Sequence, residues 1–136
     1  MNRKSPSQTA TRLRSFVRVL CREEQYDDVE GRWTFQSGGD CFRCCDAATK
    51  IATRFGGKVV GYWSSKNSEA LIGADHGDGH DFALINDRYL VDYWAFRIAR
   101  LIDNPVLDLG RSHDRHRAAI LYGDARTWEV VPVERI

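Results

Sequence analysis

Cys41, His80 and Asp92 are the residue types of a thiol-nucleophile site, and they follow one another in that order along the chain. Such a site pairs a cysteine with a histidine that takes its proton and a carboxylate that orients the histidine. Cys41 comes directly after the turn-forming sequence Gly38-Gly39-Asp40 and directly before a run that is typical of a helix. A helix N-terminus presents free N–H groups and partial positive charge, and both favour the reactive thiolate. We therefore predict that Cys41 is the nucleophile.

Two other cysteines, Cys44 and Cys45, lie one turn further along the same segment. Cys45 falls on the apolar stripe of the predicted helix and is expected in the core, and a free cysteine such as Cys41 is itself often only a small buried residue. Cys44 is the competitor for the nucleophile role. The choice between Cys41 and Cys44 depends on where the helix begins.

The pairing of His80 with Asp92 follows from a predicted hairpin. Residues 80–85 and 89–93 read as strands, because they are rich in aromatic and aliphatic residues, and residues 86–88 read as the turn between them. A turn centred on Asp87 places residue 80 opposite residue 94, so that Asp92 lies diagonally across from His80 on the same face. His80 is then the general base and later the acid, and Asp92 orients its ring.

An oxyanion that forms during attack on a carbonyl must be stabilised by hydrogen-bond donors. Gln36, five residues before Cys41, is a candidate through its side-chain amide, and the backbone N–H of Cys41 is the other. A loop glutamine that simply faces water is an equal alternative for Gln36.

The remaining pattern predicts the elements that position these residues. An amphipathic helix over residues 9–24, capped by Ser7 or Thr9, follows a disordered stretch over residues 1–8. The central helix covers residues 41–55 and ends at Gly56-Gly57. Strands are expected over residues 32–35, 58–63 and 127–133, and a last helix over residues 112–121. Residues 25–31 and 64–79 read as loops, the second with a helical turn at residues 68–72, and residues 94–109 have no clear pattern. This order indicates a single α+β domain over residues 1–136, with N-terminal helices packed on a small antiparallel sheet.

Composition narrows the function classes. The chain has 136 residues and a net charge of +1, which gives no electrostatic reason to expect nucleic acid as a partner. No apolar run is long enough to span a membrane, and the basic N-terminus is not followed by the apolar region of a signal peptide. The crowded cysteines suit a reducing compartment. We expect a cytoplasmic protein, or one delivered into a target cell without a signal peptide.

These motifs together resemble the papain-like superfamily of Cys-His-Asp enzymes. The resemblance rests on Gln36, on Gly39-Asp40-Cys41-Phe42, on Gly79-His80-Asp81-Phe82 and on Leu90-Val91-Asp92. It covers residues 36–93 and lies closest to the small bacterial branches: transglutaminase-like folds, glutamine-deamidating effectors and papain-fold toxins. It departs from the family pattern at Asp81, where relatives carry an apolar or aromatic residue.

The resemblance implies a papain-like fold and a hydrolase that attacks an amide carbonyl of a protein or peptide through a thioester. Such an enzyme is a cysteine protease or a glutamine deamidase, and it needs no cofactor and no metal.

Two other readings stay open. Cys41 and Cys44 have the spacing of a zinc pair that His76 and His80 would complete. An iron site built from His76 and Asp78 with His113 or His116 ranks below it. Alternatively the chain is a non-catalytic protein-binding module on the same fold, since fold does not fix function.

Overall fold

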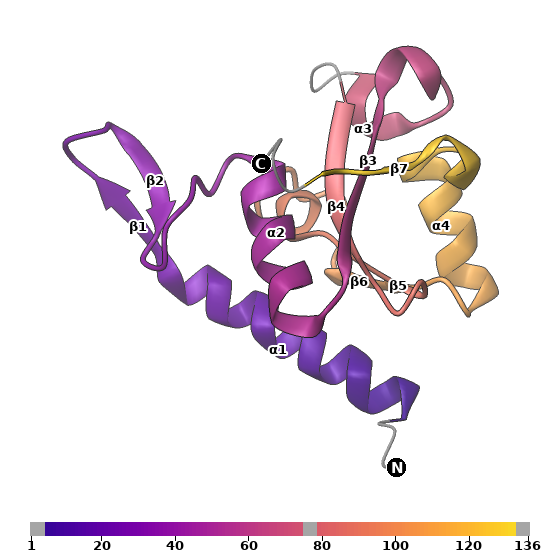
Figure 1. Ribbon diagram of the computed structural model, residues 1–136, viewed down its shortest axis with the longest axis horizontal. Coiled ribbons are helices and arrows are strands. Elements are labelled where there is room, and N and C mark those ends of the chain that lie inside the picture. Colours follow the sequence, from indigo (N-terminus) through magenta and orange to yellow (C-terminus); the bar gives the residue numbers. More distant parts are fainter. Residues whose placement is uncertain (1–4, 75–78, 133–136) are drawn as a thin grey trace.

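The computed structural model describes residues 5–74 and 79–132 (Figure 1). Its elements follow one another as α1 (Pro6–Glu23), β1 (Glu24–Asp27), β2 (Arg32–Phe35), α2 (Cys44–Phe55), β3 (Lys58–Trp63), η1 (Ser64–Lys66), α3 (Leu71–Ala74), β4 (Gly79–Ile85), β5 (Tyr89–Val91), η2 (Trp94–Ile98), β6 (Val106–Asp108), α4 (Ser112–Tyr122), η3 (Ala125–Thr127) and β7 (Glu129–Val130). The expected α+β arrangement, with N-terminal helices and an antiparallel sheet, is confirmed.

The main sheet has five antiparallel strands in the order β6-β5-β4-β3-β7. The β4–β5 hairpin pairs Ala83 with Val91 and Ile85 with Tyr89, which is the register expected for a turn centred on Asp87. Asn86 and Asp87 both adopt positive φ angles, 55° and 53°, as the tight hairpin turn requires. The register prediction is confirmed, but β5 ends at Val91, so Asp92 lies just beyond the strand rather than within it.

The sheet separates two hydrophobic cores, and Figure 1 shows α2 on one side of it and α4 on the other. The first core joins α1 and α2 to one face through residues such as Val17, Ile51 and Ala83. The second core joins α3 and α4 to the opposite face, around Phe82 and Tyr122. Residues next to one another in β4 therefore serve different cores, as the alternation of a strand dictates.

Helix α1 begins earlier than expected. Ser5 caps it, because its side chain accepts from the N–H of Gln8 while the Gln8 side chain accepts from the N–H of Ser5. The caps predicted at Ser7 or Thr9 are wrong, and residues 6–8 are helical where disorder was expected; residues 1–4 lie outside the described residues. The expected apolar stripe is confirmed, with Leu13, Val17 and Leu20 buried.

Three further expectations on local structure need correction. The acidic stretch predicted as a loop contains β1, which pairs with β2 in a hairpin that projects from the end of α1 in Figure 1. The stretch without a clear pattern contains η2, a π-helical turn, and the strand β6. The helical turn expected at residues 68–72 is not a regular turn: the segment Leu71–Ala74 has non-helical backbone at Ile72 and Gly73, and a separate turn lies at Ser64–Lys66.

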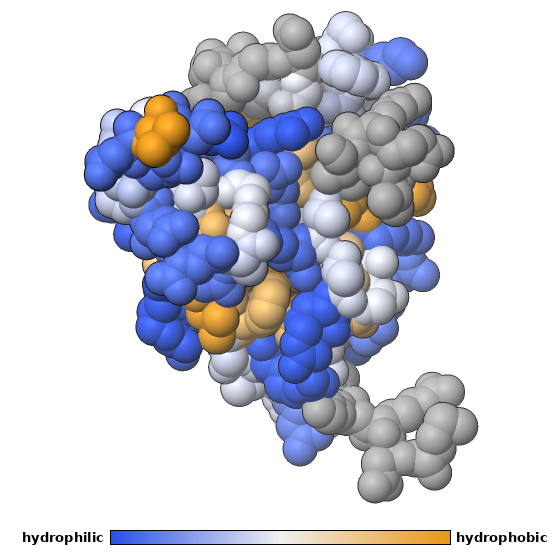
Figure 2. Space-filling view, turned by 60° about the vertical axis from the view of Figure 1, so that its left-hand side comes forward, coloured by the Kyte–Doolittle hydropathy of each residue, from blue (hydrophilic) through white to orange (hydrophobic). Residues whose placement is uncertain are grey.

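Hydrophilic side chains cover most of the face shown in Figure 2, and hydrophobic ones appear there as small separate areas. Within residues 5–74 and 79–132, none of the helices has the length and apolar character to cross a membrane.

Candidate active site

The first residue of α2 is Cys44, not Cys41. The preceding Arg43 has an extended backbone and makes no side-chain cap. The first N–H groups of a helix have no acceptor within it, so the start of α2 presents donors and partial positive charge beside the Cys44 thiol. This is the environment that the sequence analysis assigned to Cys41, and the expectation that the helix begins at Cys41 is wrong.

Two carboxylates explain why the helix starts late. Asp40 accepts from the N–H of Phe42 at 2.8 Å through its side chain, and from the N–H of Arg43 at 3.2 Å through its carbonyl. The side chain of Asp46 reaches back to the N–H of Asp40 at 2.8 Å. These bonds hold residues 40–43 in a tight turn, and side-chain acceptors of this kind compete with helix formation. The chain is free to continue as a helix only from Cys44 onward.

Cys41 lies in the first core, with 1% of its surface exposed. Its N–H donates to the carbonyl of Trp33 at 3.1 Å, so it is not available to an oxyanion. Burial and the nearby charge of Glu24 raise the pKa of the Cys41 thiol to about 11. Cys41 is therefore a neutral packing residue at physiological pH, and the structure does not place it beside His80.

His80 lies near the start of β4 and is 4% exposed. Aromatic rings surround it: the centroids of Trp94, Tyr122 and Phe82 lie 4.9, 6.0 and 6.1 Å from its own. Its Nε2 lies 2.6 Å from Oδ2 of Asp92, so the predicted His80–Asp92 pair is present. The other ring nitrogen, Nδ1, is left for the Cys44 thiol, whose hydrogen bond to the ring is one of the interactions that act on His80.

Opposing effects set the charge of His80. Burial lowers its pKa, but the charge of Asp92, the hydrogen bond to Asp92 and the interaction with Cys44 together raise it from 6.5 to about 10. The imidazole is therefore protonated at neutral pH. A cation in contact with a cysteine favours the thiolate, which is the nucleophilic form.

Asp92 is 2% exposed, and its carboxylate accepts three hydrogen bonds. Oδ2 accepts from His80 and, at 2.8 Å, from the hydroxyl of Tyr122, while Oδ1 accepts from the N–H of Ala95 at 3.0 Å. The N–H of Asp92 donates to the carbonyl of Pro105 at 3.0 Å. A buried carboxyl group is costly unless it is hydrogen-bonded in this way, and these contacts fix its orientation.

Tyr122 is the site residue that sequence reasoning missed. It is fully buried at the end of α4, thirty positions after Asp92. Burial and the charge of Asp92 raise the pKa of its hydroxyl, which keeps it a donor. Asn67 anchors this end of α4 by donating to the Tyr122 carbonyl at 2.8 Å. No spacing rule links Tyr122 to the motifs around it, because its contact depends on how α4 packs across the sheet.

Gln36 does not join the site. It is exposed in the turn after β2, and its N–H donates to the carbonyl of Glu23 at 3.0 Å. It does not line the cavity that Cys44 and His80 share. The donors that the structure places at Cys44 are instead the N–H groups at the start of α2 and the side chain of Arg43, which does line the cavity.

That cavity has a volume of about 280 Å³. Its wall comes from the start of α2, from β3 and β4, and from β7 with the residue after it: Arg43, Cys44, Cys45, Gly61, Tyr62, Trp63, Gly79, His80, Asp81, Glu129, Val130 and Val131. Gly61 leaves room for the Asp81 carboxyl, because a Cβ atom at Gly61 would lie 2.0 Å from Asp81 Oδ1. Burial raises the pKa of Asp81, against the lowering effect of His80 and Arg43. Asp81 thus lines the cavity together with Cys44 and His80.

The ligands of the alternative zinc site are not brought together in the part of the chain that the structure describes. Among residues 5–74 and 79–132, no group of three or more His, Cys, Asp or Glu side chains is placed to hold a metal ion. Cys41 lines a different pocket from Cys44. His76 and Asp78, which the two metal readings required, lie outside the described residues.

Comparisons with protein-family models, with curated proteins and with solved structures find no match to this chain. The chemistry of the site is therefore argued from its geometry.

Proposed function

We propose that the protein is a hydrolase that uses Cys44 as a nucleophile on an amide carbonyl of a protein or peptide. The observation that carries the proposal is the continuous contact from Cys44 through His80 to Asp92, formed at a helix N-terminus and open to a cavity. This arrangement also supports the resemblance to papain-like enzymes, with Cys44 in the position first given to Cys41.

The steps follow from the positions of these groups. The Cys44 sulfur attacks the carbonyl carbon, and the oxyanion faces the N–H groups at the start of α2 and the Arg43 guanidinium. The His80 imidazolium gives its proton to the nitrogen that leaves as the C–N bond breaks, which leaves a thioester on Cys44. His80, now neutral, takes a proton from a water molecule as that water attacks the thioester. The acid is released, and the thiolate–imidazolium pair is restored.

Asp92 and Tyr122 act without touching the substrate. Asp92 keeps the His80 proton on Nε2, which leaves Nδ1 to exchange a proton with sulfur and leaving group. Tyr122 holds Asp92 in place through its hydroxyl. We call both positioning residues.

The size of the leaving group distinguishes the two forms of the reaction. A glutamine side chain releases ammonia, and a peptide bond releases a new chain terminus. The cavity, at about 280 Å³, is large enough for a glutamine side chain.

Alkylation with iodoacetamide at neutral pH, followed by peptide mass spectrometry, tests the nucleophile. Cys44 should be labelled selectively, and a Cys44→Ala variant should lose this labelling. Cys41→Ala is the matched control and should keep it, because Cys41 is buried and neutral. Equal labelling of the four cysteines, seen only after denaturation, would refute the proposal.

Intact-mass measurement of candidate substrate proteins then tests the reaction. The wild-type protein should add about one mass unit to a substrate if it deamidates glutamine, or give fragments if it is a protease. Cys44→Ala should do neither, and Cys41→Ala should retain the activity.

A further inference from the structure

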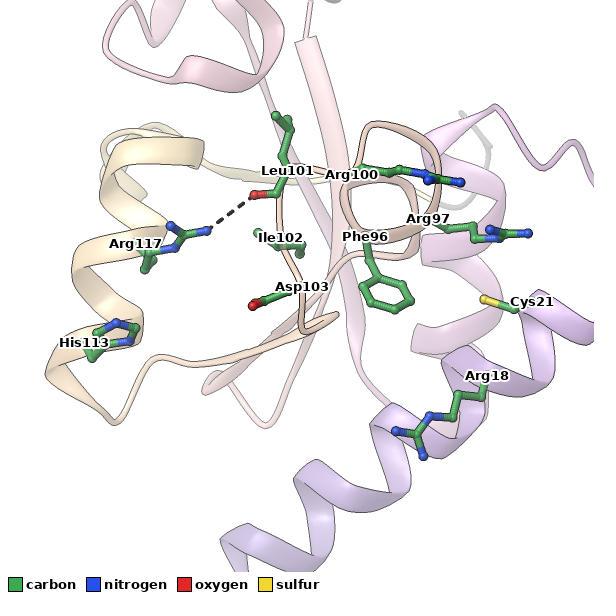
Figure 3. A pocket seen from close by; sticks show the side chains of 10 residues that line it. All are labelled: Arg18, Cys21, Phe96, Arg97, Arg100, Leu101, Ile102, Asp103, His113 and Arg117. Carbon is green, nitrogen blue, oxygen red and sulfur yellow. Dashed lines mark hydrogen bonds between the residues drawn. The ribbon is translucent and has the colours of Figure 1, made fainter.

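A second, larger cavity of about 1010 Å³ lies between α1, α4, η2 and the segment that follows η2 (Figure 3). Its lining contains four arginines, Arg18, Arg97, Arg100 and Arg117, together with the polar residues Asp103 and His113 and the apolar residues Cys21, Phe96, Leu101 and Ile102. We call it the arginine groove. The whole chain carries a net charge of +1, so this positive charge is a local feature and not a reflection of composition.

Most of this charge is not neutralised within the described residues. Arg97 is bound to Glu24, with distances of 2.9 to 3.1 Å between their charged atoms. Arg117 donates to the carbonyl of Leu101 at 3.4 Å, the bond drawn in Figure 3. Among residues 5–74 and 79–132, no ion pair is formed by Arg18, Arg100 or Arg117. Three arginines that lack an ion-pair partner among the described residues thus line one hollow, and they come from different parts of the chain.

Arg100 also has an unusual backbone. Its φ is 55°, in the left-handed region that favours glycine. The N–H of Ala99 donates to the carbonyl of Trp94 at 2.9 Å and that of Leu101 to Ala95 at 2.8 Å, a pattern that resembles a helix C-cap, where glycine is the usual residue. An arginine in a glycine position costs stability, so its presence points to a role for the side chain.

The arginine groove adjoins a second pocket near the residues that precede Cys44. This smaller pocket of about 300 Å³ shares Arg97 and Arg100 with it and is also lined by Trp33 and Phe42. Phe42 is two residues from Cys44, which limits their Cα separation to about 7 Å. Phe42 of this pocket and Arg43 of the cavity at Cys44 are also neighbours in the sequence.

We propose that the arginine groove binds an acidic segment of the protein substrate, at a distance from the amide that Cys44 attacks. Guanidinium groups bind carboxylates through paired hydrogen bonds, and the apolar floor suits hydrophobic side chains between the acidic ones. Nucleic acid fits less well, because the aromatic residue of the lining, Phe96, is packed against both cores rather than open for base stacking. That the bound segment belongs to the substrate rests on the proposed function; that the groove binds acidic peptide does not.

Fluorescence anisotropy with a labelled peptide of alternating glutamate and leucine tests the binding. The Cys44→Ala protein is used, so that no turnover is needed. Arg18→Gln and Arg100→Gly should each weaken binding by roughly threefold to fivefold, as expected for loss of one exposed ion pair. Arg54→Gln, which removes an exposed arginine that lines neither cavity, should leave the affinity unchanged. Added salt should weaken binding, because it screens the charges.

Absence of peptide binding, or an equal loss in Arg54→Gln, overturns the proposal. Tighter binding of a single-stranded oligonucleotide than of the peptide overturns it in favour of nucleic acid. The link to catalysis is tested separately in the active protein: Arg100→Gly should lower kcat/KM for an acidic substrate and leave the rate of Cys44 alkylation unchanged. If Cys44 is unreactive but the peptide binds, the proposed function fails and the acidic-peptide site stands.

Discussion

Replacing Asp92 by asparagine tests the whole site, because asparagine keeps the shape of the carboxylate and changes one oxygen to NH₂. Oδ1 accepts from the backbone of Ala95, so the amide oxygen of the variant belongs there. The NH₂ group then occupies the place of Oδ2, toward two donors, His80 and Tyr122. The hydroxyl can rotate to accept. The imidazole relieves the conflict only by moving its proton to Nδ1, which faces Cys44 and is then unable to take a proton from it.

The size of the effect follows from the charge on His80. With a pKa of about 10, His80 is almost fully protonated at pH 7.5. Without the charge of Asp92 and its hydrogen bond, the pKa falls to its ordinary value near 6.5 or below, where roughly a tenth of the imidazole or less is protonated at that pH. The cation beside Cys44 is lost to the same degree. We expect Asp92→Asn to slow alkylation of Cys44 at pH 7.5 by at least about tenfold, since an imidazolium favours the thiolate.

The assay is the rate of iodoacetamide labelling, followed by intact mass, with circular dichroism to show that each variant is folded. Tyr122→Phe is the control, because it removes one donor and leaves the His80–Asp92 bond. It should lower stability by about 1.5–3 kcal/mol, as for a hydrogen bond to a charged group, with little change in labelling. Equal labelling rates in Asp92→Asn and the wild type, with both folded, would refute the reasoning.

Three further outcomes are expected. The stabilisation that the wild type gains from protonated His80 is complete below pH 6.5 and is lost as the pH rises through about 10. The difference in unfolding free energy between wild type and Asp92→Asn, measured by urea titration, should therefore shrink between pH 6.5 and 10. A difference that grows with pH contradicts this expectation. Gly123→Ala should lower the free energy of unfolding by about 2 kcal/mol or more, because the φ of Gly123 is +69° and the added Cβ would lie 2.1 Å from Asn67 Oδ1. A melting temperature equal to that of the wild type would contradict this packing. Arg100→Gly should raise the unfolding free energy by about 1 kcal/mol through relief of its left-handed backbone, and a loss instead would show that the side chain supports the fold.

The amino-acid sequence alone predicted the β4–β5 hairpin correctly, but it did not predict where α2 begins. Alternation and turn residues predicted the β4–β5 register, and with it the approach of His80 and Asp92, because strand pairing is set by local chemistry on either side of Asp87. The start of the central helix was predicted three residues too early because Cys41 continues the four-residue spacing of the apolar stripe backwards. That spacing does not show that Asp40 and Asp46 hold the intervening residues in a turn.

Other parts of the site depend on tertiary packing. Tyr122 contacts Asp92 because α4 packs on the face of the sheet that carries His80. The sequence around His80, Asp92 or Tyr122 contains no pattern that predicts this contact. The arginine groove likewise joins cations from α1, α4 and the segment between them, which lie far apart in the sequence. Such long-range groupings leave no periodic signal, unlike the helix and strand patterns that were recognised.

The short strand β7 has a consequence for how this protein could diversify. It has two residues, Glu129 and Val130, and joins the sheet at its edge beside Val60 and Gly61, with one further bond from the N–H of Val131 to the carbonyl of Val59 at 2.9 Å. Together with Val131 it forms one wall of the cavity at Cys44, yet none of its residues holds the triad. Mutations there can change which side chains the cavity admits while the proton-transfer groups stay in place. If the proposed function holds, related chains are expected to vary in selectivity first at this edge, which lies outside the residues proposed for catalysis.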